Sequence, residues 1–499
     1  MLSRPASEDT FYDIHMHAFN LSHPNFYSFL ARYNLLPESI LDAGLKIVVP
    51  VAGGIFLVAG IILALIFGLF YLAVGLPFWV SAVVSILATV LLVVVVLVVL
   101  RYSTSIREKI DKTIRRLRAN FNNMLSIFEN DIGSYFLIIE NCLRETDREW
   151  QPLLQGDTIT IGKNQQKNTY KRVVMTPLMM DFGQKSKERD RSFHYNELAS
   201  KPVNEQVIDV FNAIRWYKEA TYSRYQDRLT NAYRFLKDDT QRFFEIYPFM
   251  AINTSNYQLK EIDPMLNKYF SEYRRSRAAL AEKLGTFDGD VRAMRSNFFA
   301  GIKVYPPLGF NPWPGQGEEQ QKVEKLYSYC EEHGIPMTSH GGSSGFVAIT
   351  DRNELLEVTS MKKWRAVVGK YRKLRLNIAH FPAEVVAPGA SRKSNYKLER
   401  ERFDALDDLI VTSEDVYTDF SCRAVKDEYY QWLKIVLETA GDKRQKLTER
   451  ILFGSDFAVV LGSIDSYSRY VNIFSQTEHL TDEEKHYFCC INPQRFLFG

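Results

Sequence analysis

Two histidines near the start of the chain occupy alternating positions. Residues 13–17 read DIHMH, so Asp13, His15 and His17 lie at every second position. Side chains two residues apart in a β-strand point to the same face, and two imidazoles on one face can bind one metal ion. If a strand forms here, this segment predicts a metal site.

Three further residues of metal-ligand type follow short apolar segments later in the chain. His340 precedes two glycines, His380 ends the segment IAH, and Asp456 lies within FGSDF. Histidines with an aspartate provide nitrogen and oxygen ligands that suit zinc, or manganese or iron when more carboxylate is present. The alternative interpretation is that each histidine is an interior side chain with its own hydrogen-bond partner.

A lysine accompanies these residues. Lys303 and Tyr305 lie two positions apart in GIKVY, on one face of a predicted strand. The lysine could be carbamylated and bridge two metal ions, could hold an anionic substrate as an ammonium ion, or could be a surface residue. Asp13 either supports the ligands from a second layer or accepts structural hydrogen bonds.

The elements that must position these residues are short β-rich segments separated by helical stretches. Eight such segments predict an α/β fold, a closed parallel (β/α)8 barrel of the TIM type, whose strand ends meet at one mouth where active sites form. The predicted strands are Phe11–His17, Arg172–Asp181, Ile246–Asn253, Gly301–Tyr305, Ile335–His340, Arg375–His380, Val416–Phe420 and Ile451–Asp456.

The chain is longer than a typical barrel of about 250 residues, so it must carry insertions. Residues 47–100 contain no Asp, Glu, Lys, Arg or His. At about 1.5 Å per helical residue, this stretch can cross about 30 Å of hydrocarbon twice, with a turn near Gly75 and Pro77. We therefore predict a two-helix transmembrane hairpin; the alternative is an apolar hairpin in a soluble core.

The charges after this segment predict its orientation. Residues 101–118 contain seven Lys or Arg and two Asp or Glu, which places them on the cytoplasmic side of a membrane. The predicted organisation is a barrel start in residues 1–46, a basic juxtamembrane segment in 101–118 and the remaining cytoplasmic barrel in 119–499. An additional helical insertion is predicted at about 184–245.

The position of the hairpin between the first two strands leaves two alternatives. If the first barrel helix lies near 121–143, the hairpin leaves from the mouth, and the substrate could derive from lipid. If that helix lies at 26–43, the hairpin leaves from the opposite rim and serves only as an anchor. The net charge of +3 and the lack of a zinc finger, Walker loop or basic aromatic helix argue against a nucleic-acid partner.

Seven segments together resemble amidohydrolase family 2, the branch of TIM-barrel metal-dependent hydrolases that includes aminocarboxymuconate-semialdehyde decarboxylase. The resemblance spans all eight predicted strands. The chain departs from the family pattern in its hairpin and after the third strand, where residues 253–255 read NTS in place of Asp-Pro-Arg. The seven segments are DIHMH, GIKVYPPLGFNP, SHGG, IAHFP, VYTDFS, FGSDF and NPQRFLFG.

The resemblance implies particular roles for the candidate residues. His15, His17, His340 and Asp456 would bind one or two divalent metal ions, most simply zinc, with His380 as acid/base or second-metal ligand. Asp456 would accept the proton of a metal-activated water, while His380 or Lys303 stabilises the oxyanion. Lys303 and Tyr305 would contact the substrate.

The implied function is that of a membrane-anchored metal-dependent hydrolase. Its substrate would be a small molecule of carbonyl type, an amide, lactone or ester. A metal-dependent decarboxylase or other lyase on the same site is the second hypothesis, and a non-catalytic, membrane-tethered binding or scaffold protein is the third. The sequence leaves a homo-oligomer, the number of metal ions and carbamylation of Lys303 open.

Overall fold

A computed structural model shows how these segments are arranged. It divides the chain into two compact units, residues 1–29 with 120–499 and residues 30–119. The second unit and the predicted hairpin at 47–100 lie outside the described residues, so the hairpin stays a prediction. Of the helices that the structure describes, none is both long and apolar enough to cross a membrane. The structure describes residues 9–23, 123–145, 152–163, 167–182, 203–227, 232–237, 242–274, 298–382 and 393–499.

Eight parallel strands form a nearly closed barrel, which confirms the predicted barrel and places one barrel strand in each of the eight predicted segments. Each strand pairs with the next along the barrel. Between the last strand and the first, the Ile14 amide donates to the Phe453 carbonyl and Met16 bridges Phe457. The strands are β1 (Thr10–His17), β5 (Arg172–Leu178), β9 (Phe249–Ala251), β10 (Gly301–Val304), β11 (Met337–Ser339), β12 (Leu376–Ile378), β13 (Val416–Asp419) and β14 (Ile451–Leu452).

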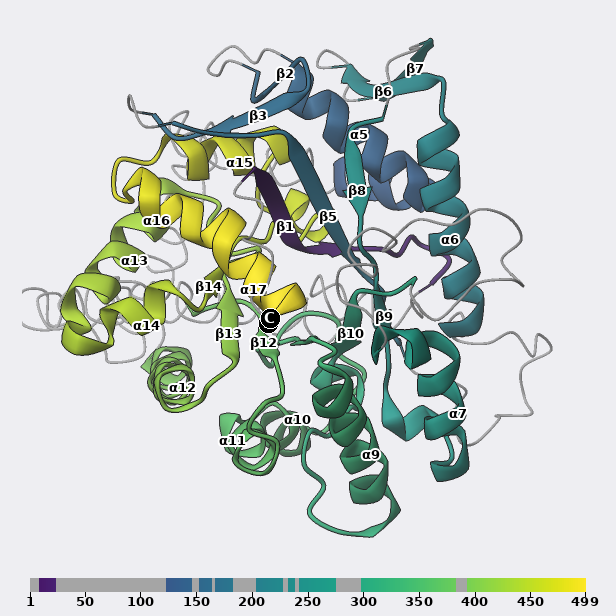
Figure 1. Cartoon of the computed structure of the whole chain (residues 1–499), viewed down its shortest axis with the longest axis vertical. Helices are drawn as coiled ribbons and strands as arrows, with labels where there is room; N and C mark the ends of the chain where they lie inside the picture. Colours follow the sequence, from purple (N-terminus) through teal and green to yellow (C-terminus); the bar gives the residue numbers. More distant parts are fainter. Residues whose placement is uncertain are drawn as a thin grey trace, which may run out of the picture. The chain divides into compact units, whose positions relative to one another are not determined.

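Helices cover the strands on the outside. Figure 1 shows α9, α11, α12 and α13 outside β10 to β13. All residues of β1, β10, β11, β12 and β13 are buried, because one side of each strand faces the barrel interior and the other faces helices. The α-helices are α5 (Ile132–Arg144), α6 (Val203–Glu219), α7 (Leu259–Phe270), α9 (Gly317–His333), α10 (Arg352–Val358), α11 (Met361–Lys370), α12 (Lys393–Thr412), α13 (Asp427–Thr439), α14 (Arg444–Thr448), α15 (Tyr467–Gln476), α16 (Asp482–His486) and α17 (Asn492–Phe498).

The prediction of a helical insertion at 184–245 was wrong for its second half. After α6, the chain forms an antiparallel hairpin of β6 (Tyr222–Asp227) and β7 (Ala232–Lys237). Aromatic residues recur through this stretch and favour strands, although the apolar spacing before residue 220 is helical. Residues 184–202 lie outside the described part of the chain.

The third predicted strand is interrupted. Its first residue, Ile246, ends β8 (Phe244–Ile246), which pairs only with β5, and its later part contains β9, which continues the barrel. Pro248 lies between them, and a proline has no backbone N–H for a sheet. A second antiparallel sheet, β2 (Leu154–Gln155), β3 (Thr158–Ile161) and β4 (Asn168–Tyr170), precedes β5 and was not predicted.

The described residues on either side of the segment 24–122 meet at the C-terminal end of β1. The amide of Leu21 donates to the Phe128 carbonyl at 2.9 Å, and the Asn20 side-chain amide donates to the Asn130 carbonyl at 3.2 Å. In the described part of the chain, α5 follows β1 and overlaps the stretch 121–143 that the first alternative requires, while the stretch 26–43 lies outside the described residues. The described residues that flank the insertion therefore lie together beside the C-terminal end of β1.

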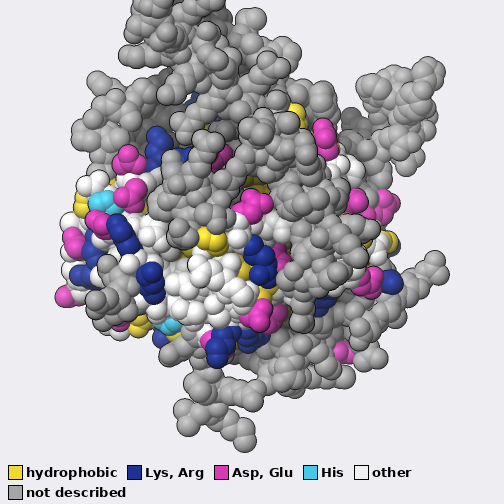
Figure 2. Space-filling view, turned by 90° about the horizontal axis from the view of Figure 1, so that it is seen from above, with side chains coloured by type: hydrophobic (Ala, Val, Ile, Leu, Met, Phe, Trp, Pro, Cys, Tyr) yellow, Lys and Arg dark blue, Asp and Glu magenta, His cyan; other side chains and the backbone are white. Residues whose placement is uncertain are grey.

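Acidic and basic side chains are mixed on one face of the molecule. On the face seen in Figure 2, Lys and Arg side chains lie beside Asp and Glu side chains, and few hydrophobic side chains are visible. This mixture agrees with the small net charge of +3.

Candidate metal centre

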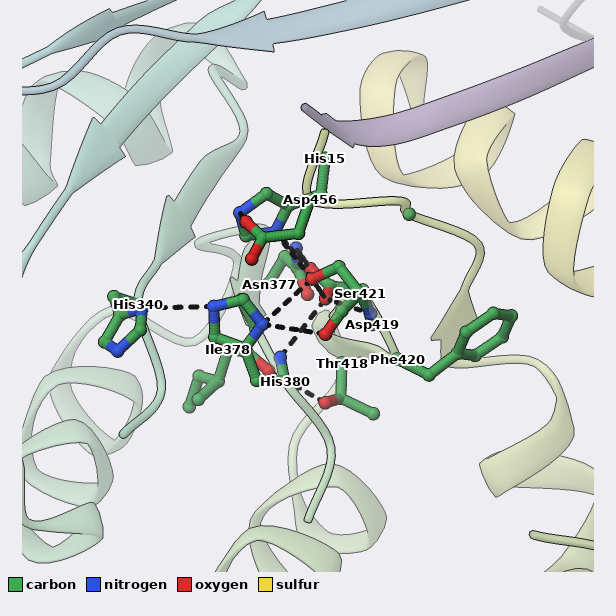
Figure 3. A network of polar contacts seen from close by, with 12 residues as sticks. His15, His340, Asn377, Ile378, His380, Thr418, Asp419, Phe420, Ser421 and Asp456 are labelled. Atoms are coloured by element: carbon green, nitrogen blue, oxygen red, sulfur yellow. Dashed lines mark hydrogen bonds and ion pairs between the residues drawn. The ribbon is translucent and has the colours of Figure 1, made fainter. Parts of the chain in front are cut away.

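Residues from the first, sixth and eighth barrel strands converge at the mouth. His15, His380 and Asp456 each offer one ligand atom, and these atoms lie within 4.8 Å of one another (Figure 3). His17 lies beside them, with Nε2 2.8 Å from Asp456 Oδ1. All four side chains are buried. The structure thus brings together residues that are separated by up to 441 positions in the chain.

The first strand presents both histidines to this point. The rings of His15 and His17 lie 5.3 Å apart, and the pairing of β1 with β5 shifts register between Asp13 and Met16. The Asp13 carboxylate accepts hydrogen bonds from the backbone amides of His15 (3.1 Å) and Ser455 (3.0 Å). Of the two predicted roles, the geometry favours that of a structural acceptor. The carboxylate joins the first strand to the residues that follow the eighth strand.

Two site residues have an unusual backbone conformation. His380 has a φ of 66° and Asp456 a φ of 63°, in the left-handed region that costs a residue with a side chain about 1 kcal/mol or more. His380 lies two residues after the end of β12 and Asp456 four residues after the end of β14. The conformation directs their side chains toward the mouth (Figure 3).

The prediction missed Asp419, at the end of β13. Its Oδ2 lies 3.0 Å from His15 Nδ1 and 2.7 Å from the side-chain amide of Asn377. Its Oδ1 accepts from the backbone amides of His380 and Ser421, each at 3.1 Å. The signal was present, because Asp419 ends the seventh predicted strand within VYTDFS, at the same barrel edge as the histidines.

The partners of each ring determine where its proton lies. The Asp419 carboxylate can only accept, so His15 donates from Nδ1 and its Nε2 carries a lone pair. His380 donates from Nδ1 to the Ser421 carbonyl at 3.0 Å, so its Nε2 also carries a lone pair when the ring is neutral. Burial lowers the pKa of His380 to about 3, which keeps the ring neutral at physiological pH.

Polar atoms around this point lack the partners that burial demands. His15 Nε2 lies 3.4 Å from Asp456 Oδ1, and both are buried without a well-directed hydrogen bond in the described residues. Unpaired buried polar groups are costly, and two facing acceptors repel each other. A cation bound to both atoms removes that cost. The donor set of His15, His380 and Asp456 therefore fits a divalent metal ion, and His17 lies against the same Asp456 carboxylate.

His340 lies farther from this group than predicted. Its Nδ1 is 3.1 Å from His380 Nε2, and its Nε2 is 2.6 Å from the Ser344 carbonyl. Since a carbonyl only accepts, Nε2 carries the proton, and the neutral ring then presents a second lone pair to His380. Burial and the neighbouring His380 hold the pKa of His340 well below its ordinary value. These facing lone pairs are compatible with a cation there also.

Charge in the site is divided between two carboxylates and one amine. Although burial opposes ionisation, neighbouring imidazoles and hydrogen bonds hold the pKa values of Asp419 and Asp456 well below the ordinary value. Burial lowers the pKa of His17 to about 4, against the effect of Asp456. Lys303 is 1% exposed and has no hydrogen-bond partner in the described residues. Burial lowers its pKa to about 8.

Tyr305 lies against His340. The two rings stack at 4.2 Å, and the Tyr305 hydroxyl accepts a hydrogen bond from the Phe346 amide at 3.1 Å. The Lys303 ammonium lies 5.7 Å from the centre of the tyrosine ring. Tyr305 therefore connects the lysine to the loop that follows β11.

One protein-family model matches the second half of the barrel in sequence. The family model of amidohydrolases matches residues 275–499. The amidohydrolase match includes β10 to β14 and with them Lys303, His340, His380 and Asp456. It does not include β1, whose histidines reach the site only through the fold. The sequence resemblance was predicted for all eight strands, and the family model matches the last five of them. No protein of curated function matches the chain in sequence.

Solved structures with some similarity have various activities. A probable 2-pyrone-4,6-dicarboxylic acid hydrolase from Acinetobacter baumannii shares 12% identity over 66% of this chain and 84% of its own, with a TM-score of 0.32. A 5-carboxyvanillate decarboxylase from Novosphingobium aromaticivorans, complexed with manganese, shares 8% over 65% and 76%, with a TM-score of 0.31. A 4-oxalomesaconate hydratase from Rhodopseudomonas palustris shares 13% over 65% and 76%, with a TM-score of 0.34. Similarity this low transfers no activity to the chain.

Proposed function

We propose that the chain is a metal-dependent hydrolase of the amidohydrolase type that acts on a small carbonyl-type substrate, an amide, lactone or ester. One observation carries the proposal: His15, His380 and Asp456, from three barrel strands, place ligand atoms within 4.8 Å of one another in a buried setting. The amidohydrolase match over the second half of the barrel supports the same reaction class. A fold alone would not do so.

The ligands of the proposed metal ion are His15, His17, His380 and Asp456, with His340 available for a second ion. Zinc suits this set, and manganese or iron are alternatives. When bound, the metal supplies Lewis acidity, which polarises a carbonyl oxygen and makes water more acidic.

The remaining steps belong to side chains of the chain. Asp456 is ionised and lies at the centre of the site, where it can accept the proton of the attacking water and return it to the leaving group. The Lys303 ammonium has no hydrogen-bond partner in the described residues, and it carries positive charge below a pH of about 8. It can therefore hold an anionic group or stabilise the oxyanion.

Metal analysis of the purified full chain tests the proposal. We expect one or two equivalents of transition metal, and we expect His15→Ala combined with His17→Ala to abolish binding. His479→Ala is the matched control, since His479 pairs with Asp427 at 3.4 Å, away from the site. Native protein that binds no metal would contradict the hydrolase and favour a binding or scaffold protein.

Substrate profiling then decides the reaction. Cleavage of amides, lactones or esters by the metal-loaded protein, absent in the double variant, supports hydrolysis. Release of carbon dioxide from carboxylated substrates without such cleavage would replace the hydrolase by a lyase on the same residues.

We further propose that residues 47–100 anchor the protein in a membrane, with the barrel on the cytoplasmic side. The support is the uncharged composition of the segment and the basic residues that follow it. Because the described residues on both sides of the segment 24–122 lie together at the C-terminal end of β1, a substrate derived from the bilayer is part of this proposal.

A further inference from the structure

Asp419 is a highly connected carboxylate of the site, and none of the roles assigned above uses it. It is fully buried at the C-terminal end of β13. Five donors surround it, from His15, Asn377, His380 and the backbone and hydroxyl of Ser421. They come from the first, the sixth and the seventh strands and the residues that follow them. Figure 3 shows the carboxylate at the centre of this network.

The donors divide between the two carboxylate oxygens. Oδ2 accepts from the His15 ring and the Asn377 side chain, while Oδ1 accepts from the backbone amides of His380 and Ser421. All of these are acceptor roles, which an ionised carboxylate fulfils completely and an amide of the same shape cannot. The chemistry of the surroundings therefore requires a carboxylate at this position.

One of these bonds decides the chemistry of His15. Since Asp419 accepts from Nδ1, the proton of the neutral ring is on Nδ1 and the lone pair is on Nε2, the nitrogen that lies 3.4 Å from Asp456 Oδ1. A histidine binds a metal ion only through an unprotonated nitrogen, and the partner of its other nitrogen sets the tautomer.

The other oxygen acts on His380. The His380 amide donates to Oδ1 at 3.1 Å, where the residue has a φ of 66°. Ser421 extends the contact, because its hydroxyl donates to Asp419 and lies 3.0 Å from His380 Nδ1. The carboxylate thus contacts both the backbone that orients His380 and the hydroxyl beside its ring.

We propose that Asp419 is a positioning residue that fixes His15 in the metal-binding tautomer and holds the backbone of His380 in its left-handed conformation. The inference rests on the metal centre proposed above, and it adds a requirement that the ligands alone do not contain. Asp419 itself does not bind the metal.

The test compares Asp419→Asn with a matched control in the full chain. The amide nitrogen of the substituted side chain cannot accept a hydrogen bond, so the asparagine cannot satisfy all the donors that surround Asp419. We expect His15 to move its proton to Nε2 and the affinity for zinc to fall about 10- to 100-fold. Asp181→Asn is the control, because Asp181 is a buried carboxylate that follows a different strand, β5, and accepts from the Asn253 backbone amide and the Asn256 side chain. This variant should lose stability and keep its zinc affinity.

Nitrogen-15 NMR of the histidine rings supplies a readout that a purely structural role would not change. In metal-free wild-type protein we expect the Nδ1–H tautomer of His15, and this measurement needs no variant. The Nε2–H tautomer in wild type, or wild-type zinc affinity in Asp419→Asn, would overturn the inference. Wild-type protein that shows the expected tautomer but binds no zinc would contradict the metal centre instead, so the two failures are distinguishable.

Discussion

At the residue scale, the site is a set of charges that the barrel keeps away from water. Two carboxylates, four imidazoles and one amine are buried within it. Each carboxylate has imidazole neighbours, but Lys303 has no hydrogen-bond partner in the described residues. An unpaired buried charge is costly to the folded state, so Lys303 should have a function that justifies its cost.

Replacing Lys303 by methionine should therefore stabilise the metal-free protein. A decrease of its pKa from 10.5 to about 8 corresponds to about 3.5 kcal/mol at roughly 1.4 kcal/mol per pH unit. The unfolded chain binds the proton more tightly, so wild-type stability should rise between pH 8 and 10.5. The advantage of Lys303→Met should be full below pH 8 and decline above it. Chemical denaturation with a chelator present, at several pH values, measures this.

Lys485→Met is the control for this prediction. Lys485 is equally buried, but its ammonium donates to the carbonyls of Ser475 (2.9 Å) and Thr477 (2.8 Å). Its replacement leaves these acceptors unpaired and should destabilise the protein by about 1–3 kcal/mol. Equal destabilisation by both substitutions would contradict the role of Lys303 as an unpaired cation.

At the element scale, a short capped helix supports the closing strand of the barrel. Thr481 and Glu484 form a capping box at the start of α16, with hydrogen bonds of 3.1 Å and 2.9 Å between side chain and backbone. The helix continues through a π-helical segment, Tyr487–Ile491, in which the Phe488 carbonyl accepts from the Phe453 amide at 2.8 Å. The cap thus stabilises the element that holds the end of β14.

Thr481→Ala should lower the free energy of unfolding by about 1 kcal/mol, because the backbone amide of Glu484 loses its partner. Thr481→Ser keeps the hydroxyl and should retain most of the stability. Denaturant titration followed by tryptophan fluorescence measures both variants. A serine variant as unstable as the alanine variant would show that packing of the threonine methyl, and not the cap, matters.

At the scale of the whole molecule, the residues on either side of the insertion between β1 and α5 contact each other directly. Asn20 and Leu21 bond to Asn130 and Phe128, and the rings of Phe19 and Phe128 stack at 5.1 Å. These contacts close the base of the insertion within the barrel unit itself. The barrel should therefore not depend on residues 47–100 for its fold.

Replacement of residues 47–100 by a short Gly-Ser linker tests this independence and the anchor together. We expect the shortened chain to leave the membrane fraction, to remain folded and to bind the same amount of metal as the full chain. Membrane fractionation, circular dichroism and metal analysis are the measurements. Persistence in the membrane fraction would argue against the anchor, and loss of metal binding would argue against an independent barrel.

The sequence alone determined the strands and the residues at their ends. Apolar β-rich segments with chemistry at their C-terminal ends predicted the barrel, and the pattern of His15 and His17 required only the two-residue repeat of a strand. These are local properties, since strand periodicity and the direction of parallel strands decide them. The short antiparallel strands β6 and β7 were wrongly predicted to be helical. The apolar residues of α6, just before them, have helical spacing, and the prediction extended that helix into the aromatic residues that follow.

Only the tertiary structure decided which side chains meet. The distances that place His380, and not His340, in the group with His15 and Asp456 depend on loop conformations after β11 and β12. Asp419 matters because it accepts hydrogen bonds from donors on several strands. The most distant of these donors, His15, lies 404 residues away from Asp419 in the chain. Sequence spacing cannot encode such contacts one by one, because closure of the barrel creates them all at once.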